Sequence, residues 1–172
     1  TRDGVTLPGQ QKGVPVYIHY VSPRFFETIG FPLLAGRDIA WSDRETSQRV
    51  MVINETLAKQ IFAGQNPVGR SVEMNGNDVE IVGLAGDTKF ESLRRSVPAT
   101  VYIPFRQNVQ FSMTYVVRSE TELQALVTAV RLVVESVDPN VPMYEVKTQV
   151  EQINDLIRRE RLFAALLSVF AV

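Results

Sequence analysis

The C-terminal end of the chain changes character abruptly, and this change limits what the chain can fold into. After the charged residues 158–161, the last eleven residues, Leu162 to Val172, are apolar except for Ser168. A helix without a polar face must be buried on every side. About 20 largely apolar residues cross a bilayer, so this run resembles the first half of a membrane-spanning helix. We therefore expect a domain excised from a membrane protein, with residues 161–172 as the start of its transmembrane helix.

A buried core helix or a dimerising helix of a soluble domain is the alternative for the same residues, because eleven apolar residues fit either interpretation. The segment before them favours one continuous helix. Thr148 and Glu151 form a capping box, and residues 149–172 contain neither Gly nor Pro. At 1.5 Å per residue such a helix is roughly 36 Å long. It would connect the preceding domain rigidly to a bilayer.

The rest of the chain has the composition of a folded, water-soluble body. Of its 172 residues, 45% are hydrophobic and 22% are charged, with a formal net charge of -1. This length fits one domain or two small subdomains. The balanced charge and the absence of long Lys/Arg runs make nucleic acid an unexpected partner. The chain has no cysteine, which excludes disulfides and thiolate chemistry.

The first quarter of the chain predicts a strand followed by a short helix. Residues 14–21 alternate in polarity as a half-buried strand does, and Ser22 can cap a helix that Gly30 ends. Residues 31–37 are again extended. Residues 38–49 are polar without periodicity, so we place a subdomain boundary near residue 40.

The next segment predicts a strand and a helix in close succession. The apolar run 50–53 indicates a buried strand, Asn54 can cap the helix that follows, and Gly64 ends that helix. The helix carries apolar residues at helical spacing. Together with the strands that follow it, this segment predicts a compact β-rich unit up to about residue 105.

An Asn-Gly pair at 75–76 lies between two alternating segments, 71–74 and 79–84. This arrangement is a good signal for a β-hairpin. Residues 99–105 and 111–118 are rich in Tyr, Val, Ile and Thr, and we predict a strand in each.

The clearest helix prediction follows residue 118. Ser119 and Glu122 form a capping box, and apolar residues then recur every three or four positions as far as Val137. A strand is predicted over 141–146 before the final helix. The resulting order of elements predicts an α+β fold of split βαβ type, interrupted by a smaller β-rich inserted subdomain.

The sequence offers no catalytic, cofactor-binding or metal-binding residues. His19 is the only histidine, it lies in the middle of a predicted strand, and we interpret it as structural. The chain lacks a Gly-x-Ser-x-Gly nucleophile elbow and a set of zinc ligands. The hydrolase and metalloenzyme classes are therefore not supported.

The segment Gly83-Leu84-Ala85-Gly86-Asp87 follows a strand, as phosphate-binding loops do, but it lacks the third glycine or the Gly-Lys-Ser/Thr that such loops require. The charged residues after it predict a solvated turn or, as the alternative, a partner-binding edge. These residues are Asp87, Lys89, Glu91, Arg94 and Arg95, and the same two interpretations apply to Asp43, Arg44 and Glu45.

Four blocks of the sequence are distinctive in their order and spacing. They are Val21-Ser22-Pro23-Arg24-Phe25-Phe26 with Gly30 and Leu34-Ala35-Gly36-Arg37-Asp38; Val52-Ile53-Asn54-Glu55-Thr56-Leu57-Ala58 with Phe62, Gly64, Asn66-Pro67 and Gly69; Ile81-Val82-Gly83 with Gly86-Asp87; and Arg159-x-Arg161-Leu162-Phe163 before Ala164-Ala165-Leu166-Leu167. Together these blocks resemble the periplasmic core domain of MacB/FtsX-type ABC transporter permeases. The resemblance covers nearly the whole chain.

This resemblance implies a non-catalytic domain on the periplasmic side of the bacterial cytoplasmic membrane, between the first two transmembrane helices of a permease. It implies a porter-like βαβ subdomain (1–40 and 106–160), an inserted β-rich subdomain (41–105), and membrane contact through the C-terminal helix. The implied partners are a cytoplasmic ABC ATPase, a second permease subunit and a periplasmic adaptor protein.

Three hypotheses for function follow. In the first, the domain passes ATP-driven movement from the membrane to an extracytoplasmic partner or substrate. In the second, it is a binding module that captures a lipid, lipoprotein or peptide through an apolar patch containing Phe25, Phe26, Phe31 and Trp41. The third, a soluble enzyme, would require Asp87, Lys89 and His19 to meet in a cleft.

Overall fold

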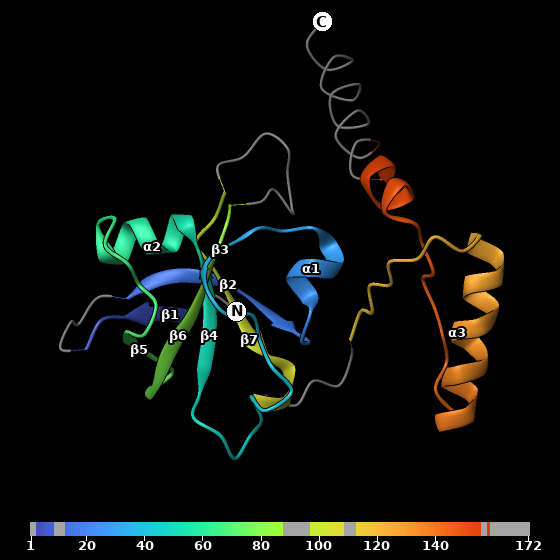
Figure 1. Ribbon diagram of the computed structural model, residues 1–172, viewed down its shortest axis with the longest axis horizontal. Helices are drawn as coiled ribbons and strands as arrows, with labels where there is room; N and C mark the ends of the chain where they lie inside the picture. Colours follow the sequence, from blue (N-terminus) through green and yellow to red (C-terminus); the bar gives the residue numbers. More distant parts are fainter. Residues whose placement is uncertain (1–2, 9–12, 88–96, 109–112, 156–157, 159–172) are drawn as a thin grey trace, which may run out of the picture. The chain divides into compact units, whose positions relative to one another are not determined.

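A computed structural model describes residues 3–8, 13–87, 97–108, 113–155 and 158 (Figure 1). Contacts within the chain separate two units, residues 1–118 and residues 119–172. We describe each unit by itself.

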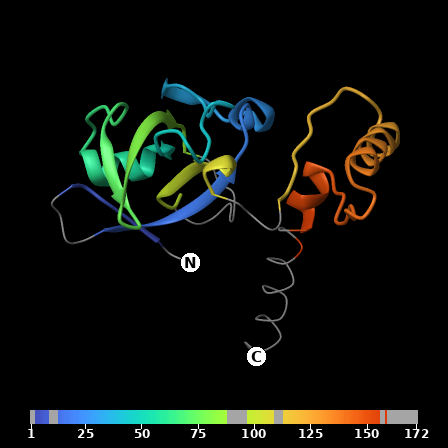
Figure 2. The same cartoon turned by 90° about the horizontal axis from the view of Figure 1, so that it is seen from below.

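The first unit is built on one seven-stranded sheet in the order β3-β6-β4-β7-β2-β1-β5 (Figures 1 and 2). Because β5 also pairs with β6, six of these strands close into a ring, and β3 is attached to its outside. Closure leaves the six strands with few unpaired backbone edges. The strands are β1 (Asp3–Thr6), β2 (Val14–Val21), β3 (Leu33–Gly36), β4 (Val50–Asn54), β5 (Ser71–Met74), β6 (Asn77–Ala85) and β7 (Thr100–Pro104).

The register mixes local and long-range pairs. The hairpin β5–β6 and the pair β1–β2 are antiparallel, whereas β2 pairs parallel with β7 and β4 pairs parallel with β6. The hairpin turn contains only Asn75 (φ 52°) and Gly76 (φ 73°). Two positive φ values in succession are typical of a type I′ turn, so the hairpin prediction is confirmed.

Strand β4 is central, and every one of its residues is buried. Met51 and Ile53 belong to one apolar core, which they share with residues of β1, β2, β5, β6 and β7 and with α2 (Glu55–Phe62). Val50 and Val52 belong to a second core, together with Phe26 of α1 (Phe25–Ile29). A strand buried on both faces is apolar at nearly every position, which explains the uninterrupted run 50–53 before Asn54.

Two glycines allow β3 to approach β6 closely. A Cβ on Gly36 would collide with the carbonyl oxygen of Val82, and a Cβ on Gly83 would collide with the carbonyl oxygen of Arg37. Gly36 also has a φ of +77°, which side-chain-bearing residues rarely adopt. These two glycines are therefore structural, and they lie within the motifs that carry the family resemblance.

The helix ends differ in part from the predictions. Ser22 does not cap α1 with its side chain; Arg24, at a φ of 65°, is the N-cap residue, whereas the predicted left-handed stop at Gly30 is confirmed at a φ of 76°. In α2 the predicted cap is confirmed, because the Asn54 side chain accepts a hydrogen bond from the Leu57 N–H. The C-cap of α2 is Ala63, one residue before the predicted glycine.

The second unit contains α3 (Leu123–Val137), which confirms the clearest helix prediction. Its cap is Glu122 rather than Ser119, because the Glu122 carboxylate accepts hydrogen bonds from the N–H groups of Gln124 and Ala125 at 2.9 and 3.3 Å. The capping box of Thr148 and Glu151 is confirmed in both directions, with N–H to oxygen distances of 2.7 and 3.1 Å. Helical backbone follows over residues 149–155.

Two predicted strands are wrong for the residues that the structure describes. Residues 113–118 and 141–146 have no strand pairing, although both are rich in strand-forming residues. Strand propensity alone forms no ladder unless a second strand supplies the hydrogen bonds. A short 3₁₀ turn, η1 (Phe105–Gln107), lies where the predicted strand 99–105 ends.

Strand pairing crosses the predicted subdomain boundary near residue 40. Strand β2 lies before this boundary, and it pairs directly with β7, which lies after it. Local sequence carries no signal for such a long-range parallel pair. Within the described residues, no helix is long and apolar enough to span a bilayer. The predicted transmembrane residues 161–172 lie outside the described part.

Candidate functional site

The described part of the chain shows where several of the polar residues singled out by sequence lie. His19 lies in β2 and stacks on Tyr102 of β7, with 5.6 Å between the ring centroids. Lys89, Glu91, Arg94 and Arg95 lie outside the described residues. Where the structure describes the chain, no group of three or more His, Asp or Glu residues is arranged to hold a metal ion.

A buried amide joins four segments at one end of β4. The Asn54 side chain is 1% exposed, and its oxygen accepts hydrogen bonds from the N–H groups of Leu57 and Thr100 at 3.1 and 2.9 Å. Its nitrogen donates to the Asp87 carboxylate at 2.8 Å and to the Pro98 carbonyl at 2.9 Å. All four hydrogen-bonding positions of the amide are therefore used. We call this set of residues the Asn54 junction.

Asp87 completes the Asn54 junction from the other side. Its carboxylate accepts hydrogen bonds from the Thr56 N–H at 3.0 Å and from the Thr56 hydroxyl at 2.9 Å, in the first turn of α2. A carboxylate at this position also interacts favourably with the helix dipole. Asp87 is thus a structural anchor, and neither prediction for it, a solvated turn or a partner-binding edge, describes its hydrogen bonds.

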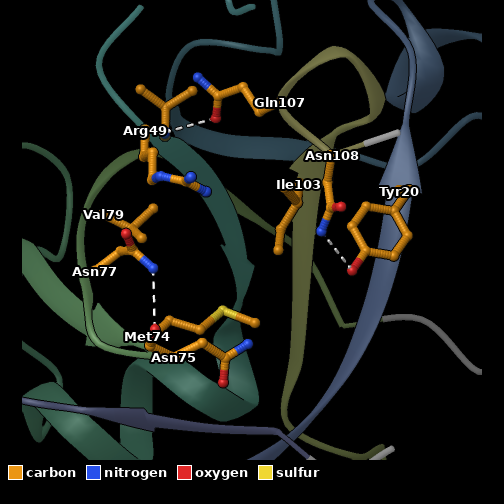
Figure 3. A pocket seen from close by; sticks show the side chains of 10 residues that line it. Tyr20, Arg49, Met74, Asn75, Asn77, Val79, Ile103, Gln107 and Asn108 are labelled. Atoms are coloured by element: carbon orange, nitrogen blue, oxygen red, sulfur yellow. Dashed lines mark hydrogen bonds between the residues drawn. The ribbon is translucent and has the colours of Figure 1, made fainter. Parts of the chain in front are cut away.

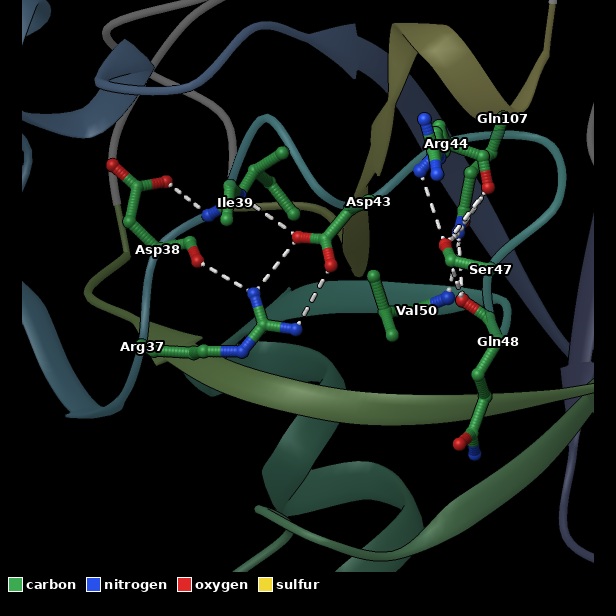
Figure 4. Close-up of polar contacts among 10 residues, drawn as sticks. Arg37, Asp38, Ile39, Asp43, Arg44, Ser47, Gln48, Val50 and Gln107 are labelled. Atoms are coloured by element: carbon green, nitrogen blue, oxygen red, sulfur yellow. Dashed lines mark hydrogen bonds and ion pairs between the residues drawn. The ribbon is translucent and has the colours of Figure 1, made fainter.

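The loop of residues 37–49 is held at its first half by an ion pair (Figure 4). Two nitrogens of the Arg37 guanidinium bind the two oxygens of Asp43 at 2.8 and 3.0 Å, and the Ala40 N–H donates to the same carboxylate at 2.8 Å. Burial by itself would raise the pKa of Asp43, but these hydrogen bonds outweigh it and lower the pKa. Asp43 is therefore bound within its own loop, which excludes the solvated interpretation.

Nearby Asp38 has a raised pKa, because its partial burial outweighs the hydrogen bond that it accepts from the Ile39 N–H. The two aspartates of one loop therefore shift in opposite directions. The difference lies in the guanidinium, which binds the side chain of Asp43 but only the backbone carbonyl of Asp38.

Gln107 holds the second half of the 37–49 loop (Figure 4). Its buried side-chain oxygen accepts a hydrogen bond from the Val50 N–H at 3.1 Å. Its nitrogen donates to the Gln48 carbonyl at 2.7 Å and to the Ser47 hydroxyl at 3.1 Å. A side chain from η1 thus fixes a loop about sixty residues earlier in the chain, a relation that no local sequence pattern predicts.

The four aromatic residues proposed as a capture patch do not form one. Phe26 is 2% exposed, and Phe25 and Phe31 pack around it in the second core. Trp41 is 62% exposed and lies edge-on against Phe105 of η1, with 6.4 Å between ring centroids. Exposure therefore separates Trp41 from the three phenylalanines.

A small surface cleft lies between the β5–β6 turn and η1 (Figure 3). Its volume is about 60 Å³. Its polar walls carry one cation and no carboxylate, and its apolar residues come from β4, β5, β6 and β7. The lining residues are Tyr20, Arg49, Val50, Met74, Asn75, Asn77, Val79, Ile103, Gln107 and Asn108.

Sequence reasoning missed this cleft, because its residues come from segments far apart in the chain. The Asn-Gly turn predicted the hairpin but not what faces it. The sequence predicted one part of the Asn54 junction, the cap of α2 by Asn54. The hydrogen bonds from Asn54 to Asp87 and Pro98 depend on the tertiary fold, so the sequence did not predict them.

Comparison with known proteins gives a consistent match. The family described as MacB-like periplasmic core domain matches residues 2–153. The chain is 27% identical over 84 residues to a macrolide export ATP-binding/permease protein MacB of Aggregatibacter actinomycetemcomitans, and 28% identical over 76 residues to one of Syntrophobacter fumaroxidans. These alignments cover 49% and 44% of this chain but only 13% and 11% of the relatives.

Solved structures share the fold. The crystal structure of the periplasmic region of MacB from Actinobacillus actinomycetemcomitans gives a TM-score of 0.58 at 18% identity, covering 78% of this chain and 63% of that one. The extracellular domain of the noncanonic ABC-type transporter YknZ from Gram-positive bacteria gives a TM-score of 0.56 at 15% identity, covering 85% of this chain and 80% of that one. The match to the MacB-like periplasmic core domain over residues 2–153 confirms the family part of the sequence resemblance, and the solved structures confirm the fold.

Proposed function

Because the chain belongs to the family of MacB-like periplasmic core domains, we propose that it is the extracytoplasmic domain of an ABC transporter permease in the bacterial cytoplasmic membrane. In this role it passes ATP-driven movement from the membrane to an extracytoplasmic partner or substrate. It performs no catalysis itself, and ATP is hydrolysed by a cytoplasmic ATPase, fused or separate. A second permease subunit and a periplasmic adaptor are the further partners of this proposal.

The observation that carries the proposal is the family match over residues 2–153. Two features of the described residues are consistent with transmission of force. The loops of the first unit are fixed by internal bonds at Asn54, Asp43 and Gln107. A reciprocally capped helix begins at Thr148 and precedes the apolar C-terminal run.

The test is an insertion of Gly-Gly-Pro at Arg159 in the full-length permease. This insertion breaks any continuous helix at that point. We expect ATP hydrolysis to continue while transport is lost. The matched control is the same insertion after Gly64, which lies in an exposed turn with open space around it. Transport that survives the Arg159 insertion would contradict the coupling role.

The alternative is a module that captures a lipid, lipoprotein or peptide. Trp41 is the observation in its favour, because it is exposed while its backbone is fixed by the Arg106 guanidinium, which donates to the Trp41 carbonyl at 3.1 Å. The burial of Phe26 and the packing of Phe25 and Phe31 count against a shared apolar patch. Coupling is therefore the preferred function.

A further inference from the structure

We propose that the cleft between the β5–β6 turn and η1 binds a single carboxylate group, with Arg49 as the residue that pairs with it. This proposal rests on the cleft alone and does not depend on the transporter function. The chemistry is the same for a small free carboxylate and for an acidic side chain of a polypeptide, and the experiment below separates these two sources.

The first observation is the charge of Arg49. Among the described residues no carboxylate lies within ion-pair distance of its guanidinium, whereas Arg24 is paired with Glu27 and Arg37 is paired with Asp43. Figure 3 shows the Arg49 side chain directed toward the space between the hairpin and β7. The ten lining residues include no Asp or Glu. The cleft therefore presents one uncompensated positive charge.

The second observation is that the backbone of Arg49 is held in place on both sides. The Arg49 carbonyl accepts a hydrogen bond from the Glu80 N–H at 3.0 Å. The N–H of the next residue, Val50, donates to Gln107 at 3.1 Å. An anion at the cleft thus meets a cation whose main chain is already ordered, which reduces the entropy lost on binding.

The third observation is the set of neutral groups around the cleft. The Tyr20 hydroxyl accepts a hydrogen bond from the Asn108 amide at 3.1 Å and keeps its own proton for donation. The Asn77 side-chain amide donates to the Asn75 backbone carbonyl at 2.9 Å, which fixes the main chain of Asn75, a lining residue of the cleft. The Asn75 amide itself makes no side-chain hydrogen bond within the described residues. Tyr20 and Asn75 can therefore donate to an anion beside Arg49.

Size and surroundings favour a small group. A volume of about 60 Å³ is far below the roughly 300–1,000 Å³ of sites for drug-sized ligands. Met74 and Val79, which also line the cleft, are buried. Apolar lining residues lower the local dielectric constant and strengthen an ion pair formed beside them. A planar carboxylate also matches the two parallel N–H donors of a guanidinium.

The experiment is an NMR titration of the chain of residues 1–172, following the Arg49 Nε–H and Asn75 side-chain amide signals at constant ionic strength. The titrants are sodium acetate, an acetylated and amidated Gly-Glu-Gly peptide, and sodium chloride. We expect saturable shifts with both carboxylates and none with chloride. Tighter binding of the peptide than of acetate assigns the site to acidic side chains, and equal binding assigns it to small free carboxylates.

Two variants and one control complete the test. Arg49→Gln removes the charge and should weaken carboxylate binding at least tenfold. Asn75→Asp keeps a residue that tolerates the positive φ of the turn but places a carboxylate beside Arg49, and it should weaken binding by a similar factor. The control, Arg44→Gln, alters an exposed arginine of the same loop and should change the affinity less than twofold.

The proposal is overturned if neither carboxylate gives saturable shifts, if chloride gives the same shifts, or if Arg49→Gln binds as well as the unmodified chain. A well-dispersed spectrum of each variant shows that folding is retained. None of these outcomes bears on coupling in the permease, which the Arg159 insertion tests separately.

Discussion

The two units of this chain use similar apolar residues in different ways. In the first unit six strands form a closed ring, and apolar residues from these strands pack together in one core. Met51, Ile53 and Ile81 of this core are fully buried. In the second unit α3 has a regular apolar pattern, yet none of its residues is buried, and Val137 is 83% exposed. A periodic pattern is thus sufficient to define a helix. Burial also requires a partner surface, and in the first unit the paired strands supply it.

The same contrast applies to strands. Residues 50–53 and residues 141–146 are both rich in strand-forming residues, but only the first segment has neighbours on both sides, β6 and β7. A strand gains its stability from cross-strand hydrogen bonds and side-chain pairs. Within the described residues no strand pairs with residues 141–146, so they form no ladder despite their propensity.

The largest effect that separates the two units is expected from core truncation. Ile81→Ala should lower the free energy of unfolding by about 2–5 kcal/mol, because it removes buried methyl groups and leaves a cavity. The matched change in the second unit, Leu132→Ala, removes an exposed side chain and should change the free energy of unfolding by less than about 0.5 kcal/mol. Urea denaturation of both variants measures the difference, and equal losses would contradict the contrast in burial.

The next largest effect concerns the Asn54 junction. Asn54→Ala should lower the free energy of unfolding by about 2–4 kcal/mol, since it removes four hydrogen bonds and takes the amide oxygen away from the buried N–H groups of Leu57 and Thr100. The control is Asn140→Ala in the exposed turn after α3, where the side-chain amide donates to the Asp138 carboxylate at 3.1 Å. Thermal unfolding of the two variants provides the measurement. A loss below that of the control would show that the junction does not stabilise the first unit.

A smaller and pH-dependent effect is expected at Asp43. Its lowered pKa means that its contribution to stability is present above the pKa of the unfolded chain and is lost as the pH falls through the folded pKa. Asp43→Asn should therefore lower the free energy of unfolding by about 1–2 kcal/mol at neutral pH. This range is kept small because the Arg37 side chain is half exposed, so solvent weakens the ion pair. The cost should shrink as the pH falls below about 4.

The comparison variant for Asp43 is Glu27→Gln, which breaks the fully exposed pair with Arg24. We expect no measurable change in stability from it at any pH. Denaturation curves of both variants between neutral and acidic pH provide the measurement. A pH-independent cost of Asp43→Asn would show that its ion pair is not the source of the stabilisation.

The smallest effect is expected at the start of α3. Glu122→Ala removes the cap of this helix and should destabilise it by about 0.5–1 kcal/mol. Amide hydrogen exchange should quicken in the first turn of α3, while exchange in β4 stays unchanged. Equal acceleration in both places would show that the two units unfold as one.

Local sequence predicted those parts of the fold whose signals are themselves local. The Asn-Gly turn, the Asn54 cap and the capping box at Thr148 are each formed by residues within four positions of one another, and all three are confirmed. The wrong N-cap prediction for α1 also has a local cause. Ser22 is a common N-cap residue, whereas the observed N-cap, Arg24, has a left-handed φ that arginine rarely adopts.

The candidate site could not be predicted in the same way, because each part of it joins distant segments. Arg49 and Asn75 meet at one cleft only because β4 and the β5–β6 hairpin belong to one ring. Gln107 holds residues 47–50 only because β7 lies beside β4. The charge of Asp87 predicted a solvent-exposed side chain, whereas its carboxylate accepts hydrogen bonds at the start of α2.

By itself the sequence determined the identity of most local elements, the family, and the apolar C-terminal run at residues 162–172. Periodicity and capping are properties of neighbouring residues, so a linear chain displays them directly. The tertiary structure alone decided the closure of the six-stranded ring, the pairing of β2 with β7, and the absence of an ion-pair partner for Arg49 among the described residues. These features depend on contacts between segments whose separation along the chain leaves no periodic trace.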